Sequence, residues 1–128
     1  MNSSGEFIKI NEKGKKYYHI YFNDNKDEIK RNYLNKDDKV NKIKIIAENK
    51  IRSFSKLLYD CKCIESIYFK RFYMKHITDM NYMFYECSSL KELNLTNFHS
   101  NNVTNMCDMF NGCSLLKELN INNLILIM

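Results

Sequence analysis

A stretch of 22 residues recurs along this chain every 26 residues, and this repeat constrains the fold more than any other feature. The second copy, residues 77–98, reads ITDMNYMFYECSSLKELNLTNF, and the third, residues 103–124, reads VTNMCDMFNGCSLLKELNINNL. A more divergent first copy covers residues 51–72. Apolar residues occupy the same phase in every copy. A fixed period of this length, with no insertion between copies, indicates an array of stacked structural units.

Within one repeat the apolar spacing changes from helical to extended. The first four apolar positions are spaced i, i+3, i+4 and i+7, as in Met80, Met83, Phe84 and Cys87. This spacing predicts one stripe of a short helix, and Thr78 and Thr104 lie where an N-cap would stand. Leu93 and Leu95 then alternate with polar residues, which predicts a strand. Strands of successive repeats would lie parallel, joined by right-handed helical crossovers.

We therefore predict an α/β fold, a right-handed solenoid of about three repeats over residues 51–128, with copies at 51–76, 77–102 and 103–128. Residues 1–50 read as a β-rich region that caps the first repeat, because an array otherwise exposes a hydrophobic end. In this region we expect strands at 6–10 and 15–23, paired as a hairpin through the polar turn Asn11–Gly14. Residues 29–34 have a short helical spacing, and residues 40–47 return to strand character.

The repeat motif also resembles a known family. The pattern T-x-M-x-x-M-F-x-x-C-x-x-L-x-x-L-x-L, present in the second copy and, with Ile121 at its last position, in the third, is similar to the BspA-type leucine-rich repeat. This is the 26-residue repeat of bacterial surface proteins that is abundant in protists as well. The resemblance covers residues 51–124. It implies a leucine-rich-repeat solenoid that binds proteins or mediates adhesion and that performs no catalysis.

The charge is unevenly distributed. Residues 1–76 hold 18 Lys and Arg against 10 Asp and Glu, whereas residues 77–128 hold 2 against 5, which together give the net charge of +5. A basic half is typical of chains that bind nucleic acid or an anionic surface. Here the lysines are scattered among acids, which favours a solvated face, so we do not expect nucleic acid to be the main partner.

The N-terminal residues contain no apolar run like that of a signal peptide, and no stretch reaches the ~20 apolar residues of a membrane span. We expect a cytoplasmic location with reduced thiols and no transmembrane segment. If the chain is a fragment of a longer adhesin, a cell-surface location follows instead.

Residues with catalytic potential are sparse. Three glycines, at 5, 14 and 112, form no phosphate-binding loop, and the three histidines have no nucleophile at a recognisable spacing. Cys61, Cys87 and Cys113 share one phase of the repeat and are predicted to form a buried ladder of thiols, while Cys107 lies off the apolar stripe and is predicted to be exposed. The cysteine and histidine spacing does not suit zinc. We expect no enzyme, no metal and no cofactor.

The outward face of the predicted strands remains as the candidate binding surface. Its side chains would stack in three columns: Ser66, Glu92 and Glu118; Tyr68, Asn94 and Asn120; Lys70, Thr96 and Asn122. A regular array on a rigid scaffold suits a protein partner, whose identity the sequence does not give. The alternatives are a nucleic-acid or anionic-surface binder working through the basic half and a fragment of a larger adhesin. The apolar residues 125–128 further predict self-association through an uncapped C-terminal end, most simply as a two-fold dimer.

Overall fold

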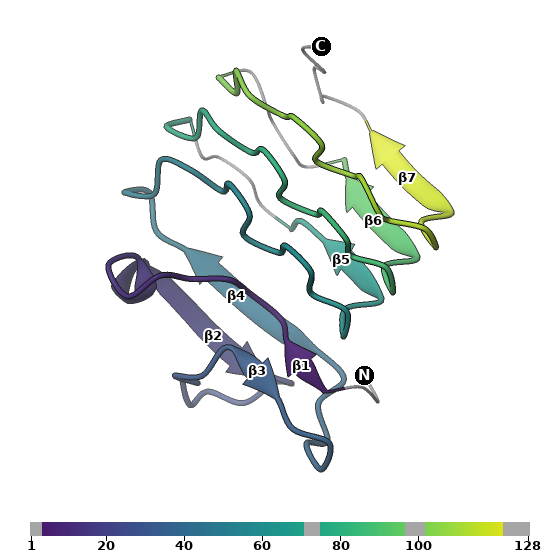
Figure 1. Ribbon diagram of the computed structural model, residues 1–128. Helices are drawn as coiled ribbons and strands as arrows, with labels where there is room; N and C mark the ends of the chain where they lie inside the picture. The colour runs from purple at the N-terminus through teal and green to yellow at the C-terminus, as the bar shows by residue number, and fades with distance from the viewer. Residues whose placement is uncertain (1–3, 71–74, 97–101, 122–128) are drawn as a thin grey trace.

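The computed structural model describes residues 4–70, 75–96 and 102–121. Figure 1 shows the repeats packed side by side, with the N-terminal strands at one end of the stack. The elements in chain order are β1 (Gly5–Glu6), η1 (Lys15–Tyr17), β2 (Tyr18–Phe22), β3 (Tyr33–Leu34), β4 (Ile43–Ala47), β5 (Ser66–Tyr68), β6 (Glu92–Leu95) and β7 (Glu118–Ile121).

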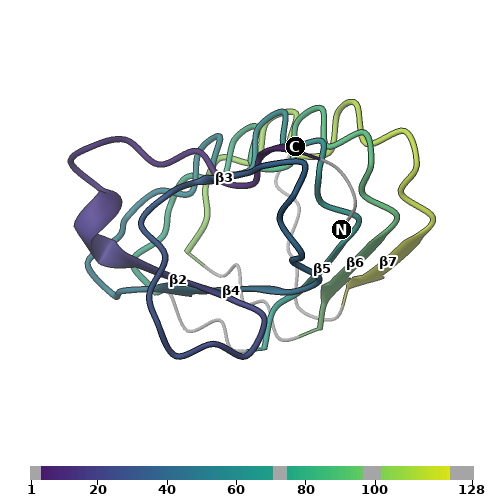
Figure 2. The same ribbon diagram turned by 90° about the horizontal axis from the view of Figure 1, so that it is seen from below.

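The strand predicted near the end of each repeat is present. β5, β6 and β7 form a three-stranded parallel sheet, in which each residue pairs with the residue 26 positions further along the chain. Leu93 pairs with Ile67 on one side and with Leu119 on the other. The period of the sequence thus sets the register of the sheet. Figure 2 shows this sheet in one layer and the first part of each repeat in the opposite layer.

The first part of each repeat is a run of turns where a helix was predicted. These turn segments span residues 54–60, 80–86 and 106–112, in each of which the last six residues are turn residues and none is helical. Left-handed backbone recurs every fourth residue, at Lys56 (φ 58°) and Asp60 (φ 56°) in the first segment and at Tyr82 (φ 56°) and Glu86 (φ 57°) in the second. A residue with positive φ ends a right-handed turn, so a continuous helix cannot form.

Hydrogen bonds in the turn segments alternate between two directions. Every second amide donates across to the next repeat, as from Lys56 to the carbonyl of Asn81 at 2.9 Å and from Tyr82 to that of Cys107 at 2.9 Å. The intervening amides close four-residue turns, as from Leu57 to the carbonyl of Phe54 at 3.1 Å. The predicted N-cap threonines have no helix to cap. The backbone amide of Thr78 donates instead to the carbonyl of Arg52 at 3.1 Å, and the backbone amide of Thr104 donates to the carbonyl of Thr78 at 2.8 Å.

The predicted fold class is therefore wrong. In the described residues the only helical element is η1, a 3-10 helix of three residues, and the remaining elements are short parallel and antiparallel strands. The chain is all-β, not an α/β leucine-rich-repeat solenoid. The spacing i, i+3, i+4, i+7 predicted a helix wrongly, because successive four-residue turns place apolar side chains on one face at the same intervals.

The N-terminal strands pair differently from the predicted hairpin. β1 pairs antiparallel with β3, and β2 pairs antiparallel with β4 from Tyr18↔Ala47 to Phe22↔Ile43. Residues 7–10 lie along the first repeat instead, where the amide of Lys9 donates to the carbonyl of Leu57 at 2.7 Å. Residues 29–34 form no helix, because Ile29 bridges to Ile20 and Tyr33–Leu34 is β3.

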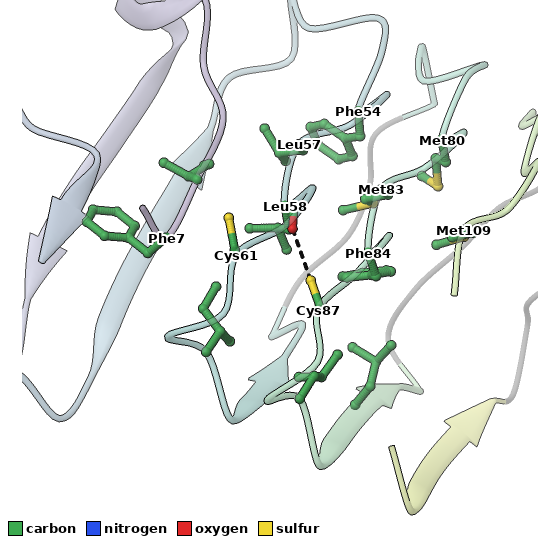
Figure 3. Close-up of a cluster of buried hydrophobic side chains, with 14 of the residues drawn as sticks. Phe7, Phe54, Leu57, Leu58, Cys61, Met80, Met83, Phe84, Cys87 and Met109 are labelled. Carbon is green, nitrogen blue, oxygen red and sulfur yellow. Dashed lines mark hydrogen bonds between the residues drawn. The ribbon is translucent and has the colours of Figure 1, made fainter. Parts of the chain in front are cut away.

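One continuous core joins the N-terminal strands to the repeats (Figure 3). The apolar stripe of the second repeat is the most deeply buried part, with Met80, Phe84, Cys87, Leu90 and Leu95 all at 0% exposure. Stacked rings continue the core along the array, since Phe84 and Phe110 lie 5.7 Å apart at an interplanar angle of 2°. Each large side chain buried in this way stabilises the fold by roughly 1.5–3 kcal/mol.

Candidate partner-binding surface

The outward face of the β5–β7 sheet is the surface that the sequence singles out. The pleat is fixed by Leu93 and Leu95, which are 1% and 0% exposed, so the alternate residues Glu92 and Asn94 point away from the core. Pairing places Ser66, Glu92 and Glu118 in one row across the strands, and it places Tyr68, Asn94 and Asn120 in the next row. The placement of Glu118 and Asn120 of β7 follows from the pairing of the β7 backbone with that of β6.

Tyr68 is the most prominent side chain of this face, with 62% of its surface exposed. Beside it, Asn94 is half-buried and is held in place by Thr96, whose backbone amide and hydroxyl donate to Oδ1 of Asn94 at 3.0 Å and 2.7 Å. An amide side chain oriented in this way keeps its own N–H groups available for a partner. Lys70 is exposed just beyond β5, and Asn122 lies outside the described residues.

The margin of the face carries opposite charges. Lys91 Nζ lies 3.8 Å from a carboxylate oxygen of Glu65, and both side chains are more than half exposed, at 54% and 59%. An exposed pair at this distance contributes little to stability. These two side chains can therefore turn towards a partner at small energetic cost, whereas Asn94 is fixed.

The thiols at one phase of the repeat have a structural role. Cys87 is fully buried, and its Sγ donates to the carbonyl oxygen of Leu58 in the preceding repeat at 3.0 Å (Figure 3). Cys113, half-buried, makes the equivalent bond to Phe84 at 3.0 Å. Burial raises the pKa of the Cys87 thiol to about 12 and raises that of Cys61 further. These thiols are therefore poor nucleophiles.

Cys107 is exposed, as its position off the apolar stripe predicted. Its Sγ lies 3.5 Å from a carboxylate oxygen of Asp108, and this neighbouring carboxylate raises the pKa of the thiol. The thiolate is thus disfavoured even at the exposed position. All five cysteines are free thiols.

Sequence reasoning missed a histidine that lies between two carboxylates. His19 on β2 has Nδ1 at 3.0 Å from Glu28 and Nε2 at 2.8 Å from Glu48. A neutral imidazole carries only one N–H, so both contacts are hydrogen bonds only when the ring is protonated. The contact with Glu48, followed by that with Glu28, raises the pKa of His19. No periodic signal links these positions: the pairing of β2 with β4 brings Glu48 to His19, and the bridge between Ile20 and Ile29 brings Glu28.

A second missed feature is an aromatic cluster on the layer that the turn segments form. The rings of Tyr59 and Tyr85 stack at 5.0 Å with an interplanar angle of 11°, and Tyr82 meets Tyr85 edge-on at 5.4 Å. Lys56 Nζ lies 5.9 Å from the centre of the Tyr82 ring. Tyr59 and Tyr85 share one phase of the 26-residue repeat, so the period could have revealed the stack.

Two other kinds of feature are absent from the described residues. Residues 4–70, 75–96 and 102–121 contain no group of three or more His, Cys, Asp or Glu placed to hold a metal ion. The same part of the chain has no helix with the length and hydropathy of a membrane span.

Comparison with known proteins corrects the predicted family. The family model that matches is described as "Mycoplasma protein of unknown function, DUF285", and it matches residues 29–124, about three quarters of the chain. No curated protein and no solved structure matches the chain. The predicted membership of the BspA-type leucine-rich repeats is therefore wrong, since the matching family is a different one. The chain belongs to the DUF285 family of Mycoplasma proteins of unknown function.

Proposed function

We propose that this chain is a non-enzymatic protein-binding module that uses the outward face of the β5–β7 sheet. The observation that carries the proposal is Tyr68, a large aromatic side chain that is 62% exposed on a regular sheet beside the oriented amide of Asn94. Tyrosine is enriched at protein interfaces, because its ring supplies apolar area while its hydroxyl supplies a hydrogen bond.

The rigidity of the sheet supports this role. Leu93 and Leu95 anchor β6 in the core, so the face does not have to order its backbone when a partner binds. A non-enzymatic role is supported by the state of the reactive groups. The thiol of Cys87 donates to a backbone carbonyl, and both ring nitrogens of His19 contact carboxylates. In the same proposal, residues 1–50 act as the cap of the repeat array.

The experiment compares capture of a cellular protein by the wild-type chain and by two tyrosine variants. Tyr68→Ser removes the exposed ring of the proposed face, and Tyr33→Ser removes a ring on β3 that is 45% exposed, which makes it the matched control. A partner held through the face is lost with Tyr68→Ser and is retained with Tyr33→Ser. Equal retention by both variants would refute the assignment of the face.

A second candidate is an anionic-surface or nucleic-acid binder working through the basic half of the chain. It is favoured by Lys13, Lys15 and Lys16, which are exposed around η1 and make no ion pair with described residues. Phosphate contacts release counterions, so binding through these lysines would weaken steeply with salt. Capture at about 50 mM and about 200 mM salt, with and without nuclease, separates the candidates, because the two modes differ in salt dependence.

A further inference from the structure

Within the turn segments, the backbone hydrogen bonds that join one repeat to the next run in one direction. In the first turn segment the amides of residues 54, 56, 58 and 60 donate to carbonyls of the second, at 2.8–2.9 Å. In the second, the amides of 80, 82, 84 and 86 donate to the third at 2.7–3.0 Å. The intervening amides donate within their own segment. Each turn segment therefore has one edge that only donates and an opposite edge that only accepts.

The third turn segment has the same donors, but none of the described residues accepts a hydrogen bond from them. The amides of Met106, Asp108, Phe110 and Gly112 stand at the phase that donates in the other two segments, but they have no acceptor within the described part of the chain. The intervening amides of this segment are paired, as from Met109 to the carbonyl of Met106 at 3.3 Å. Four parallel donors, one at every second residue, are thus left at this edge.

The accepting edge at the other end of the array is covered. There the N-terminal residues 7–10 lie along the first turn segment, and the amide of Lys9 donates to the carbonyl of Leu57 at 2.7 Å. In Figure 1 this N-terminal segment runs beside the first repeat, while the third repeat lies at the opposite end of the stack. Among the described residues, the N-terminal segment thus binds a carbonyl of the accepting edge, whereas no residue accepts from the donating edge.

We propose that the donor edge at Met106, Asp108, Phe110 and Gly112 docks a further turn segment of the same repeat type, contributed by another polypeptide. Such a segment presents carbonyl oxygens at every second residue and turns its own amides away, which is the complement of this edge. An ordinary strand presents N–H and C=O groups alternately along its edge, so its amides would face donors.

Two alternative occupants fit less well. Two copies of this chain related by a two-fold axis would set one donor edge against the other, leaving all eight amides unpaired. A head-to-tail contact between copies requires the accepting edge of the first turn segment, where Lys9 already occupies Leu57. Side-chain packing favours a repeat as partner. The half-buried ring of Phe110 stacks on Phe84, so a docked segment with an aromatic residue at this phase extends the stack.

The test uses the full chain, labelled with ¹⁵N, and an unlabelled synthetic peptide that copies residues 77–102. The carbonyls of Asp79, Asn81, Met83 and Tyr85 are the ones that accept in the native array, so this peptide carries the required acceptors. Amide hydrogen exchange is measured residue by residue, with a scrambled peptide of the same composition as control. We expect saturating peptide to slow exchange at residues 106, 108, 110 and 112 by at least about tenfold. Exchange at 109, 111 and 113, which are already paired, stays unchanged.

A pair of variants checks the role of the backbone donor. Phe110→Pro removes one amide, and Phe110→Leu removes the same ring while it keeps the amide. Phe110 is not among the residues with positive φ, which proline could not adopt. We expect the proline variant to bind the peptide about fivefold to tenfold more weakly than the leucine variant, as loss of one hydrogen bond implies.

Three results would overturn the proposal. The first is the absence of protection at the four amides in the wild-type chain with saturating peptide, which requires no variant to fold. The second is equal protection by the scrambled peptide. The third is protection of the four amides in the chain alone as its concentration rises, because that result would assign the edge to a second copy of this chain.

Discussion

The turn segment and a helix predict opposite orders of stability for two variants, Lys56→Gly and Lys56→Ala. Lys56 is exposed and left-handed at φ 58°, and its one described side-chain contact is the distant approach to the Tyr82 ring, which both variants lose equally. In an exposed helix alanine is more stable than glycine by about 1 kcal/mol. A left-handed residue with a Cβ costs about 1–2 kcal/mol, which glycine avoids.

Glycine also gains more freedom than alanine in the unfolded chain, which opposes this effect by about 0.4–1 kcal/mol. The net expectation is that Lys56→Gly exceeds Lys56→Ala in stability by about 0.8 kcal/mol, within limits of about 0–1.6 kcal/mol. Urea unfolding followed by far-UV circular dichroism measures the difference. Lys62, exposed and without positive φ, is the matched control, and there alanine should be the more stable replacement. If alanine is also the more stable at Lys56, the turn geometry is refuted.

Three further predictions concern the sheet, the thiols and the histidine. Leu93→Asp buries an unpaired charge at a side chain that is 1% exposed and should cost several kcal/mol, whereas Asn94→Asp keeps the acceptor for its neighbours and should leave the thermal midpoint nearly unchanged. A thiol reagent should label Cys107 in the native protein and Cys87 only after unfolding; equal rates would contradict the buried ladder. The raised pKa of His19 means that its stabilisation is fully present below its ordinary value of 6.5 and is lost as the pH rises through the raised value. Urea midpoints across this range should show the loss in the wild type and not in His19→Gln.

The repeat allowed the register of the sheet and the phase of the core to be predicted. Leu93 and Leu95 are buried, β5–β7 pair at the offset of 26 residues, and β4 falls within the predicted strand at 40–47. These predictions held because strand alternation indicates which residues of a strand are buried and the repeat period indicates which residues of neighbouring strands pair. The turn at Asn11–Gly14 was also confirmed, with the amide of Gly14 donating to Oδ1 of Asn11 at 2.7 Å.

The turn segments could not be predicted from apolar spacing alone. A helix and a series of four-residue turns both bring positions i, i+3, i+4 and i+7 to one side, so only the backbone conformation separates them. Three of the left-handed positions carry Lys56, Tyr82 and Glu86, which are residue types that do not signal positive φ. The other three carry Asp60, Asp108 and Gly112 (φ 84°), which are types that adopt positive φ more readily. The two-residue strands β1 and β3 are too short to show any period.

The two surfaces of this chain differ in what determines their partners. The strand face presents side chains such as Tyr68 and Glu92, so substitutions there change the surface without altering the backbone that supports it. The donor edge of the third turn segment presents backbone amides, which every residue except proline carries. Its complementarity therefore depends on the backbone geometry of the repeat and only weakly on sequence. Surface substitutions can diversify what the face binds, while the edge keeps its preference for another turn segment of the same type.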